Sequence, residues 1–174
     1  MIALVIGGSG SGKSAYAEQM AVKAAGNGSL YYVATMQVYD EEGKKKVERH
    51  QKMRAGKGFL TIEQPRRLKE AAKKVATEKV SAGKVAAGKV AAERVPAGKI
   101  VLLECMSNLV ANEMFSEENL SAVMDEAKVK QLSHEIISGV TALQDSCDIL
   151  IIVTNQIFED GIRYDASTMD YIRL

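Results

Sequence analysis

The amino-acid sequence predicts an α/β domain built around a mostly parallel sheet. Three observations support this prediction: short apolar runs alternate with helix-forming segments, a glycine-rich turn follows the first apolar run, and 174 residues suit a single domain. The chain is 47% hydrophobic and 26% charged, as is typical of a globular protein. At this length about 70% of the unfolded chain's surface can be buried, so the core needs neither disulfides nor a structural metal.

The first half of the chain contains three apolar runs and two helical segments. The continuous apolar run at residues 1–6 predicts a strand that is buried on both faces, as in a parallel sheet. Residues 13–25 are rich in helix formers with small apolar residues at helical spacing, and Gly26-Asn27-Gly28 ends this helix. The next predicted elements are a strand at 30–34, a charged helix at 41–54 and a strand at 59–63, which Gln64-Pro65 closes.

The second half continues the alternation. Residues 100–104 and 149–154 are apolar runs that predict two further buried strands. Helical patterns occupy 109–115 and 120–143 between these strands, and another pattern runs from 168 to 174. Strands that alternate with helices favour parallel pairing through crossover helices.

Residues 69–99 differ from the rest of the chain. The triplet AGK recurs at 82–84, 87–89 and 97–99, and the segment contains eight basic, three acidic and no aromatic residues. One interpretation is a basic arm for a polyanion, and the other is an alanine-rich helix and linker enlarged by short tandem duplication. The second is favoured because each glycine weakens a helix by about 1 kcal/mol and the repeats build no fixed surface.

The overall composition excludes several classes of protein. There are 23 basic and 22 acidic side chains, so the net charge of +1 gives no general attraction to nucleic acids or acidic membranes. Cys105 and Cys147 lie far apart with no CxxC motif, which excludes a disulfide framework or a cysteine zinc site. No run approaches the roughly 18 apolar residues of a membrane span, and the start of the chain lacks a basic leader region. We therefore expect a cytoplasmic protein without a nucleic-acid partner.

The strongest functional signal is Gly7-Gly8-Ser9-Gly10-Ser11-Gly12-Lys13-Ser14, which matches G-x-x-x-x-G-K-[ST] between a predicted strand and a predicted helix. Backbone N–H groups of such a loop wrap a phosphate, and the helix start adds its partial positive charge. Lys13 would reach the β- and γ-phosphate oxygens, and the Ser14 hydroxyl can ligate Mg²⁺. The motif predicts a P-loop that binds a nucleoside triphosphate with Mg²⁺, without specifying the reaction.

Two polar residues follow buried strands. Glu104 ends the 100–104 strand and is a candidate for the magnesium site or for a general base. Alternatively, Glu104 merely caps the following helix, a role that Ser107 or Asn108 would fill equally well. Asn155 lies at the mouth of the 149–154 strand, where parallel sheets bind ligands, although an asparagine in a turn explains it as well.

His50 belongs to the predicted charged helix. In a helix over 41–54, Lys46, His50 and Arg54 share one face. Two flanking cations disfavour the protonated imidazole, so His50 would be neutral near pH 7 and suited to attack on phosphorus. From the local sequence alone, a solvated histidine in a charged helix is the favoured alternative. His134, in a long helix with no cationic neighbours, is expected to be structural.

Several ordered motifs together resemble the bifunctional adenosylcobinamide kinase and adenosylcobinamide-phosphate guanylyltransferase family of cobalamin biosynthesis. These motifs are GGSGSGKS, YYVATMQ, VERHQKMR, TIEQP, VLLECMSNLVANEMF and LIIVTNQIFEDGI. The resemblance covers nearly the whole chain except residues 69–99. It implies phosphorylation of adenosylcobinamide by ATP or GTP, followed by transfer of GMP from GTP to adenosylcobinamide phosphate. It further implies a three-layer, RecA-like P-loop fold and a homotrimer with the active site at a subunit boundary.

The resemblance also implies roles for individual residues. The family motif that carries a guanylylated histidine matches Arg49-His50, which makes His50 the GMP-accepting nucleophile and reverses the local preference. Lys13 joins it as a catalytic residue, while Ser14 and Glu104 are the expected Mg²⁺ ligands. The residues expected to contact nucleotide, besides the loop from Gly7 to Ser14, are Ala34, Thr35, Met36, Gln51, Lys52, Met53, Arg54, Glu63 and Glu104.

The chain departs from the family pattern in two places. Residues 69–99 are longer and simpler than the expected connection, and the chain stops at Leu174 within a predicted helix that family members continue into a final strand. We therefore expect one domain over residues 1–174 with a truncated C-terminal helix and strand, and lowered stability. Two other functions remain open: a monofunctional P-loop kinase or NTPase of another small molecule, and a non-catalytic GTP-binding remnant.

Overall fold

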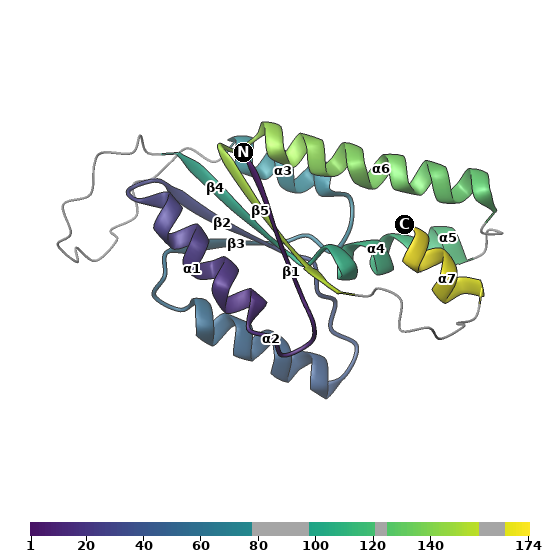
Figure 1. Cartoon of the computed structure of the whole chain (residues 1–174), viewed down its shortest axis with the longest axis horizontal. Helices are drawn as coiled ribbons and strands as arrows, with labels where there is room; N and C mark the ends of the chain where they lie inside the picture. The colour runs from purple at the N-terminus through teal and green to yellow at the C-terminus, as the bar shows by residue number, and fades with distance from the viewer. Residues whose placement is uncertain (78–97, 121–124, 157–165) are drawn as a thin grey trace.

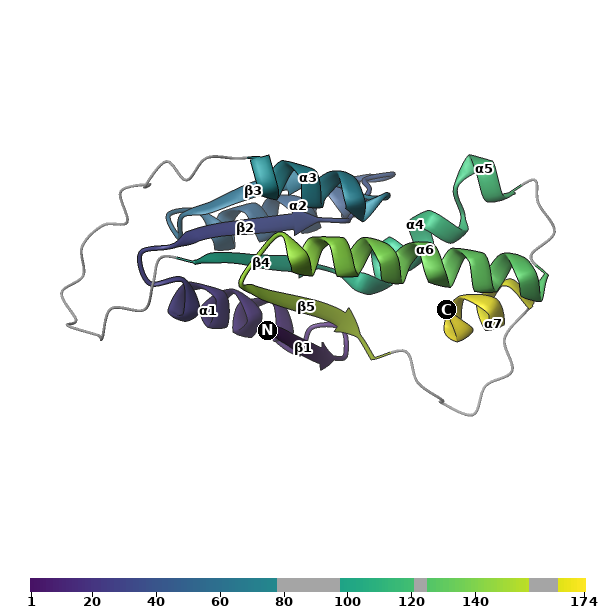
Figure 2. The same ribbon diagram turned by 90° about the horizontal axis from the view of Figure 1, so that it is seen from above.

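The computed structural model describes residues 1–77, 98–120, 125–156 and 166–174. Within these residues, five parallel strands form one sheet in the order β1-β5-β4-β2-β3. The strands are β1 (Ile2–Gly7), β2 (Ser29–Ala34), β3 (Phe59–Glu63), β4 (Lys99–Glu104) and β5 (Ile149–Asn155). The helices are α1 (Lys13–Ala25), α2 (Glu41–Arg54), α3 (Leu68–Thr77), α4 (Met106–Met114), α5 (Glu117–Leu120), α6 (Glu126–Asp145) and α7 (Ala166–Arg173). Helices lie on both faces of the sheet (Figure 1, Figure 2), which confirms the predicted three-layer α/β fold with a parallel sheet.

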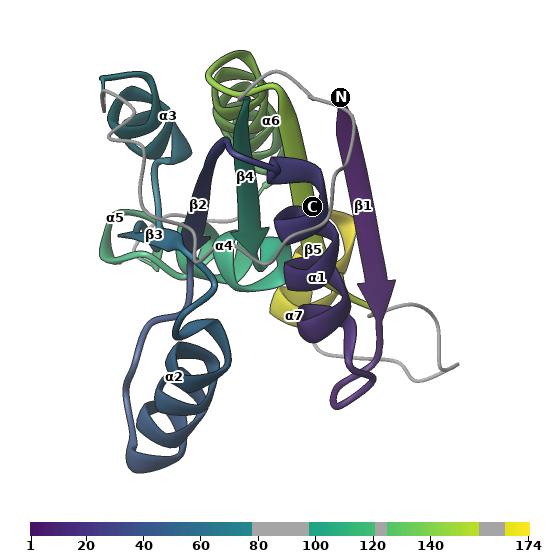
Figure 3. The same ribbon diagram turned by 90° about the vertical axis from the view of Figure 1, so that its left-hand side faces the viewer.

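The two faces of the sheet bury different sets of side chains. On one face, α1 packs its small residues Ala17, Ala21 and Ala25 against Tyr32 of β2 and Ile151 of β5. The other face is covered by α3 and α6 (Figure 3), whose buried residues include Ala71, Val75 and Leu143. Alanines let α1 approach the sheet closely, and this helix begins directly after the glycine-rich loop. The core therefore fixes the position of that loop relative to the strand ends.

All five predicted strands are present, but the prediction that the first is buried on both faces is wrong. β1 is an edge strand of the sheet in the described residues. Ala3 and Val5 pack on the α1 side, whereas Ile2, Leu4 and Ile6 are 46%, 56% and 47% exposed on the other side. A continuous apolar run shows that a strand is compatible with burial on both faces, but it carries no information about which elements cover each face.

Two helix predictions also need correction. The helix predicted over 120–143 is in fact two elements, because α6 begins only at Glu126, where the Asp125 side chain caps it by accepting from Lys128 N at 2.8 Å. Residues 69–77, which the sequence placed in the low-complexity segment, belong to α3 and bury Ala71, Ala72 and Val75 in the core. The AGK repeats at 82–84 and 87–89 lie outside the described residues.

Truncating Leu143 is expected to destabilise the domain. Its side chain is fully buried between α6 and the sheet, so Leu143→Ala should lower the free energy of unfolding by about 2–5 kcal/mol through lost burial and a residual cavity. Urea denaturation measures the change. Ile137→Ala on the same helix is the matched control, because Ile137 is 60% exposed and should change the free energy by less than about 0.5 kcal/mol. Equal effects of the two substitutions would contradict this assignment of the core.

Neither cysteine forms a disulfide: Cys105 is buried and Cys147 is half-buried, and both are free thiols. Among the helices that the structure describes, none is both long enough and apolar enough to span a bilayer.

Candidate nucleotide-binding site

The carboxyl ends of the parallel strands meet at one edge of the sheet, and a large cavity lies there. Its volume is about 900 Å³, and it is lined by the glycine-rich loop, the ends of β2, β3 and β4, and one face of α2. Parallel sheets bind ligands at this edge. The lining includes these sequence-predicted site residues: Ser9, Gly10, Ser11, Gly12, Lys13, Ser14, Ala34, Met36, His50, Gln51, Met53, Arg54, Glu63 and Glu104.

The first turn of α1 is open to an anion. Gly12 occupies the N-cap position with a φ of 84°, a left-handed conformation that suits glycine, and no side chain caps the helix. No acidic residue lies in the first turn of α1, whereas Asp40 caps α2 and Glu41 follows it. The free N–H groups and positive end of α1 therefore favour a bound phosphate.

The lysine side chain reaches back to the glycine-rich loop. Lys13 Nζ donates to the carbonyl oxygen of Gly8 at 3.0 Å, across the concave side of the loop. A Cβ at Gly7 would lie 2.6 Å from Ser11 Oγ, so a larger residue there would force the Ser11 side chain to move. Gly7 and Gly8 do not themselves line the cavity; they shape the loop that does.

Ser14 and Glu104 form the candidate magnesium site. Ser14 Oγ donates to Glu104 Oε1 at 2.5 Å, which joins the start of α1 to the end of β4. Burial raises the pKa of the Glu104 carboxyl, and the Ser14 hydrogen bond opposes that rise. Glu104 Oε2 is buried and has no partner in the described part of the chain. A hydroxyl beside a buried carboxylate oxygen with spare acceptor capacity fits Mg²⁺, which prefers few protein ligands together with water and phosphate oxygens.

No cluster of three or more His, Cys, Asp or Glu side chains that could hold a metal occurs among the described residues.

The helix α2 brings His50 to the same cavity. Lys46, His50 and Arg54 all line it, as their helical spacing predicts, and Arg49 lines it as well. Burial lowers the pKa of His50 below its usual 6.5, with further lowering by Arg49, Arg54 and Lys13 and an opposing effect of Glu18. The imidazole is therefore neutral near pH 7. Lys46, which forms an ion pair with Glu42 at 2.7 Å, is not among these causes, so the sequence predicted the direction but only one of the responsible cations.

Arg54 contacts the sheet at the end of α2. Its side chain is buried and lies over the ring of Tyr32 on β2, with 3.6 Å between the guanidinium carbon and the ring centroid. Burial and the nearby Glu104 carboxylate raise the pKa of the Tyr32 hydroxyl, so the ring is a neutral platform. This contact fixes one end of α2 beside the strand ends.

Three predicted residues have other surroundings. The Thr35 side chain is fully buried and does not line the cavity; its hydroxyl donates to the Cys105 carbonyl and accepts from the Cys105 N–H, each at 2.8 Å. Thr35 thus ties β2 to the end of β4. Lys52 is exposed and also does not line the cavity. His134 is exposed on α6 and does not line the cavity, and its structural role stays a prediction.

Other lining residues were not predicted as ligand contacts. Tyr32, Gln37, Tyr39 and Asn108 line the cavity, and so does Asn155, whose Nδ2 donates to Ser107 Oγ at 3.0 Å. For Asn155 the sequence leaves a ligand contact and a turn asparagine as alternatives, and its place in the lining follows from its position at the end of a parallel strand. The residues of the 36–39 turn have no regular spacing, so no periodicity in the sequence points to them.

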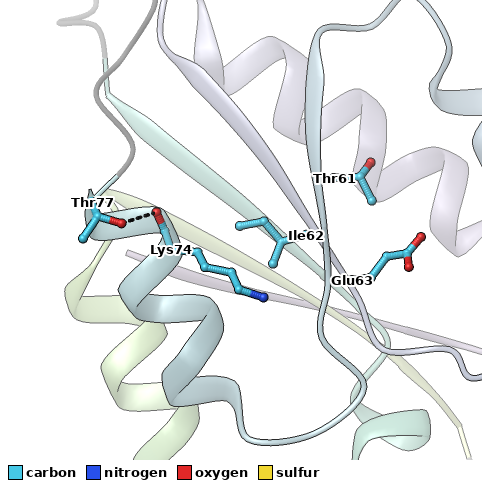
Figure 4. A pocket seen from close by; sticks show the side chains of 5 residues that line it. All are labelled: Thr61, Ile62, Glu63, Lys74 and Thr77. Carbon is cyan, nitrogen blue, oxygen red and sulfur yellow. Dashed lines mark hydrogen bonds between the residues drawn. The ribbon is translucent and has the colours of Figure 1, made fainter.

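A smaller hollow of about 320 Å³ lies on the edge strand β3 beside α3 (Figure 4). Ile62 points toward α3, whereas Thr61 and Glu63 point away from it, as alternation along a strand requires. Lys74 Nζ donates to Gln64 Oε1 at 2.9 Å. Because Thr61 and Glu63 also line the large cavity, their side chains belong to the nucleotide side of β3.

Comparison with known proteins bears on this site. The sequence profile of the family described as cobinamide kinase / cobinamide phosphate guanyltransferase matches residues 3–173. The chain is 27% identical over 160 residues to the bifunctional adenosylcobalamin biosynthesis protein CobU of Escherichia coli (strain K12), covering 90% of this chain and 76% of that protein. Among solved structures, an ATPase domain superposes with a TM-score of 0.46 at 12% identity, covering 97% of this chain and 63% of that structure.

Proposed function

Because the chain belongs to the cobinamide kinase / cobinamide phosphate guanyltransferase family, we propose that it phosphorylates adenosylcobinamide and then transfers GMP from GTP to adenosylcobinamide phosphate through a guanylylated His50. One observation carries the second half of this proposal. The neutral, half-buried His50 and the phosphate-binding loop line the same cavity, so one nucleotide can contact both.

In the kinase step, an acceptor hydroxyl attacks the γ-phosphorus of ATP or GTP, and the bond to the β-phosphate oxygen breaks. The open start of α1 would hold the phosphates, and Lys13 would leave the Gly8 carbonyl to neutralise charge on the transferred group. Ser14 and Glu104 are the residues that would hold Mg²⁺, which supplies neutralisation of the phosphate oxygens when bound.

In the transfer step, the unprotonated ring nitrogen of His50 attacks the α-phosphorus of GTP and pyrophosphate leaves. This forms a P–N bond, and a phosphate oxygen of adenosylcobinamide phosphate then attacks the same phosphorus and releases the neutral imidazole. Covalent catalysis replaces one difficult displacement by two easier ones. The lowered pKa of His50 keeps its lone pair available, and Arg49 and Arg54 provide positive charge beside the developing negative charge.

Incubation with GTP labelled at the α-phosphorus tests the covalent step. The proposal expects label on the protein that is lost in acid and retained in alkali, the behaviour of a phosphoramidate, and that is discharged by adenosylcobinamide phosphate. GTP labelled at the γ-phosphorus should leave no label of this kind. Kinase turnover without α-label would instead indicate the monofunctional kinase, and GTP binding without either reaction would indicate a non-catalytic nucleotide binder.

The pH dependence of His50 labelling should show a single fall on the acid side. Only the neutral ring can attack, and its pKa is lowered, so the rate should be highest near pH 8, fall as the pH is lowered and be half-maximal at a pH below 6.5. The initial rate of label incorporation, measured in buffers of constant ionic strength, checks this expectation. A midpoint at or above 6.5 would show that burial and the neighbouring cations do not act on His50 in solution.

Replacing Glu104 with glutamine should weaken magnesium binding. The amide preserves the volume and a hydrogen bond to Ser14 but removes the negative charge, so the Mg²⁺ concentration that supports half-maximal kinase activity should rise about 10–100-fold. A magnesium titration of the kinase rate measures it. Glu117→Gln, which alters an exposed carboxylate of α5, is the control and should leave the titration unchanged. An unaltered magnesium requirement in Glu104→Gln would remove Glu104 from the metal site.

A further inference from the structure

We propose that the ion pair between Glu18, whose side chain is fully buried, and Lys57, whose side chain is 34% exposed, is a positioning device for the transfer step, holding the end of α2 so that His50 faces the nucleotide. This inference rests on the proposed function of His50. It assigns to Glu18 and Lys57 an effect on the reaction although neither residue lines the cavity.

Glu18 joins the helix of the phosphate loop to the segment that follows α2. It lies one turn after Ser14 on α1, its side chain is 0% exposed, and Oε2 accepts from Lys57 Nζ at 2.5 Å. Glu18 is the only acidic residue of α1. Lys57 is tied to the end of α2, because its backbone N–H donates to the Arg54 carbonyl at 3.0 Å. The pair therefore connects α1 directly to the last turn of α2.

The same last turn carries the contact between Arg54 and Tyr32, and His50 lies one turn earlier. The end of α2 is thus held at two points, by Arg54 on β2 and by Lys57 on α1. The rest of the helix projects away from the sheet (Figure 3), and only Gly43 and Arg54 are buried among its 14 residues. With so few buried contacts, the direction of α2 depends strongly on these two anchors.

Stability alone does not explain an ion pair whose carboxylate is fully buried. The desolvation of that carboxylate offsets much of its attraction to Lys57, and well-packed apolar replacements of buried pairs are often as stable or more stable. The other ion pairs of α2, Glu41 with Lys44 and Glu42 with Lys46, are exposed, and such pairs contribute little. Glu18 and Lys57 instead provide a fixed geometry. The start of α1 would bind phosphate, and one turn later Glu18 holds the end of the helix that carries His50.

The kinetic test uses Glu18→Gln and the double variant Glu18→Met with Lys57→Met. We expect guanylylation of His50 to slow by about 10–100-fold in both, while γ-phosphoryl transfer and the KM for GTP change less than about twofold. The apolar double variant should retain the wild-type melting temperature, which separates positioning from folding. Glu70→Gln, which removes an exposed pair with Lys73, is the matched control. Guanylylation at the wild-type rate in a folded double variant, or equal losses of both activities, would overturn the proposal.

A second measurement does not depend on catalysis. The chain has two histidines, so the ring signals of His50 and His134 can be followed by NMR and assigned with His134→Gln. The charged groups that act on His50 are Arg49 and Arg54 of α2 and Lys13 and Glu18 of α1. If the ring stayed in place in Glu18→Gln, loss of a negative neighbour would lower its pKa further.

The positioning role predicts the opposite direction. Release of α2 exposes the ring to water, so the His50 pKa in Glu18→Gln should rise toward 6.5. A pKa that falls or stays constant would overturn the proposal. If wild-type protein forms no covalent GMP adduct, the proposed function fails, and the NMR titration still decides whether the pair holds the ring in the cavity.

Discussion

The His50→Ala variant should form no covalent adduct with GMP and should transfer GMP to adenosylcobinamide phosphate about 10⁴-fold more slowly than wild type, a scale typical of removing a nucleophile. Phosphorylation of adenosylcobinamide should continue, because the phosphate loop, Lys13 and the Ser14–Glu104 contact do not depend on the imidazole. A single variant would thus lose the transfer activity and keep the kinase activity, which α-labelled and γ-labelled GTP measure separately.

His134→Ala is the matched control for this experiment. It removes the other histidine of the chain, which is exposed on α6, and should leave both activities intact. Loss of the adduct in the His134 variant, or an adduct that persists in His50→Ala, would assign the covalent step to another residue. Parallel loss of kinase activity in His50→Ala would indicate that α2 itself had moved.

Replacing Lys13 with methionine should instead impair both reactions. Methionine keeps most of the side-chain length and removes the charge, so stabilisation of the phosphate oxygens is lost and both rates should fall about 10²–10³-fold. Rapid-quench assays of γ-phosphoryl transfer and His50 labelling measure the two effects. The fold should persist, because the Gly8 carbonyl is the only hydrogen-bond partner of Lys13 Nζ in the described part of the chain.

Lys23→Met provides the comparison, since Lys23 is exposed in the last turn of the same helix and far from its phosphate-binding start. Unimpaired His50 labelling in Lys13→Met would mean that GTP is held differently in the transfer step than in the kinase step. His50→Ala should stop the transfer reaction alone, whereas Lys13→Met should slow both reactions.

The sequence predicted much of this fold because the strongest local signals agree with the tertiary structure. The helix at Lys13–Ala25 and the strand at Phe59–Glu63 have the expected limits, since glycine and proline mark their ends. The predicted helix containing His50 also has the expected limits, Glu41–Arg54, with Asp40 as its cap. The phosphate loop could be located because its chemistry requires a contiguous motif.

The remaining features depend on contacts between distant segments. Nothing in residues 1–6 shows that one face of β1 is uncovered, because burial is decided by the neighbouring elements. The family resemblance predicts a nucleotide contact at Thr35, yet the Thr35 hydroxyl is satisfied by the backbone of Cys105, 70 residues later. Glu18 did leave a signal in the sequence: a single carboxylate among the alanines of a buried helix face must find a partner. That partner, Lys57, could be identified only from the structure.

The route between α3 and β4 has a consequence for how this chain tolerates change in length. Lys99 Nζ donates to the Val75 carbonyl at 2.6 Å, so the two points flanking residues 78–97 already lie side by side. They do so at the amino end of β4, about 20 Å, or one strand length, from Glu104 at its carboxyl end. Repeat units gained or lost there should be nearly neutral for catalysis, which makes this junction a suitable place to insert a reporter peptide or an affinity tag.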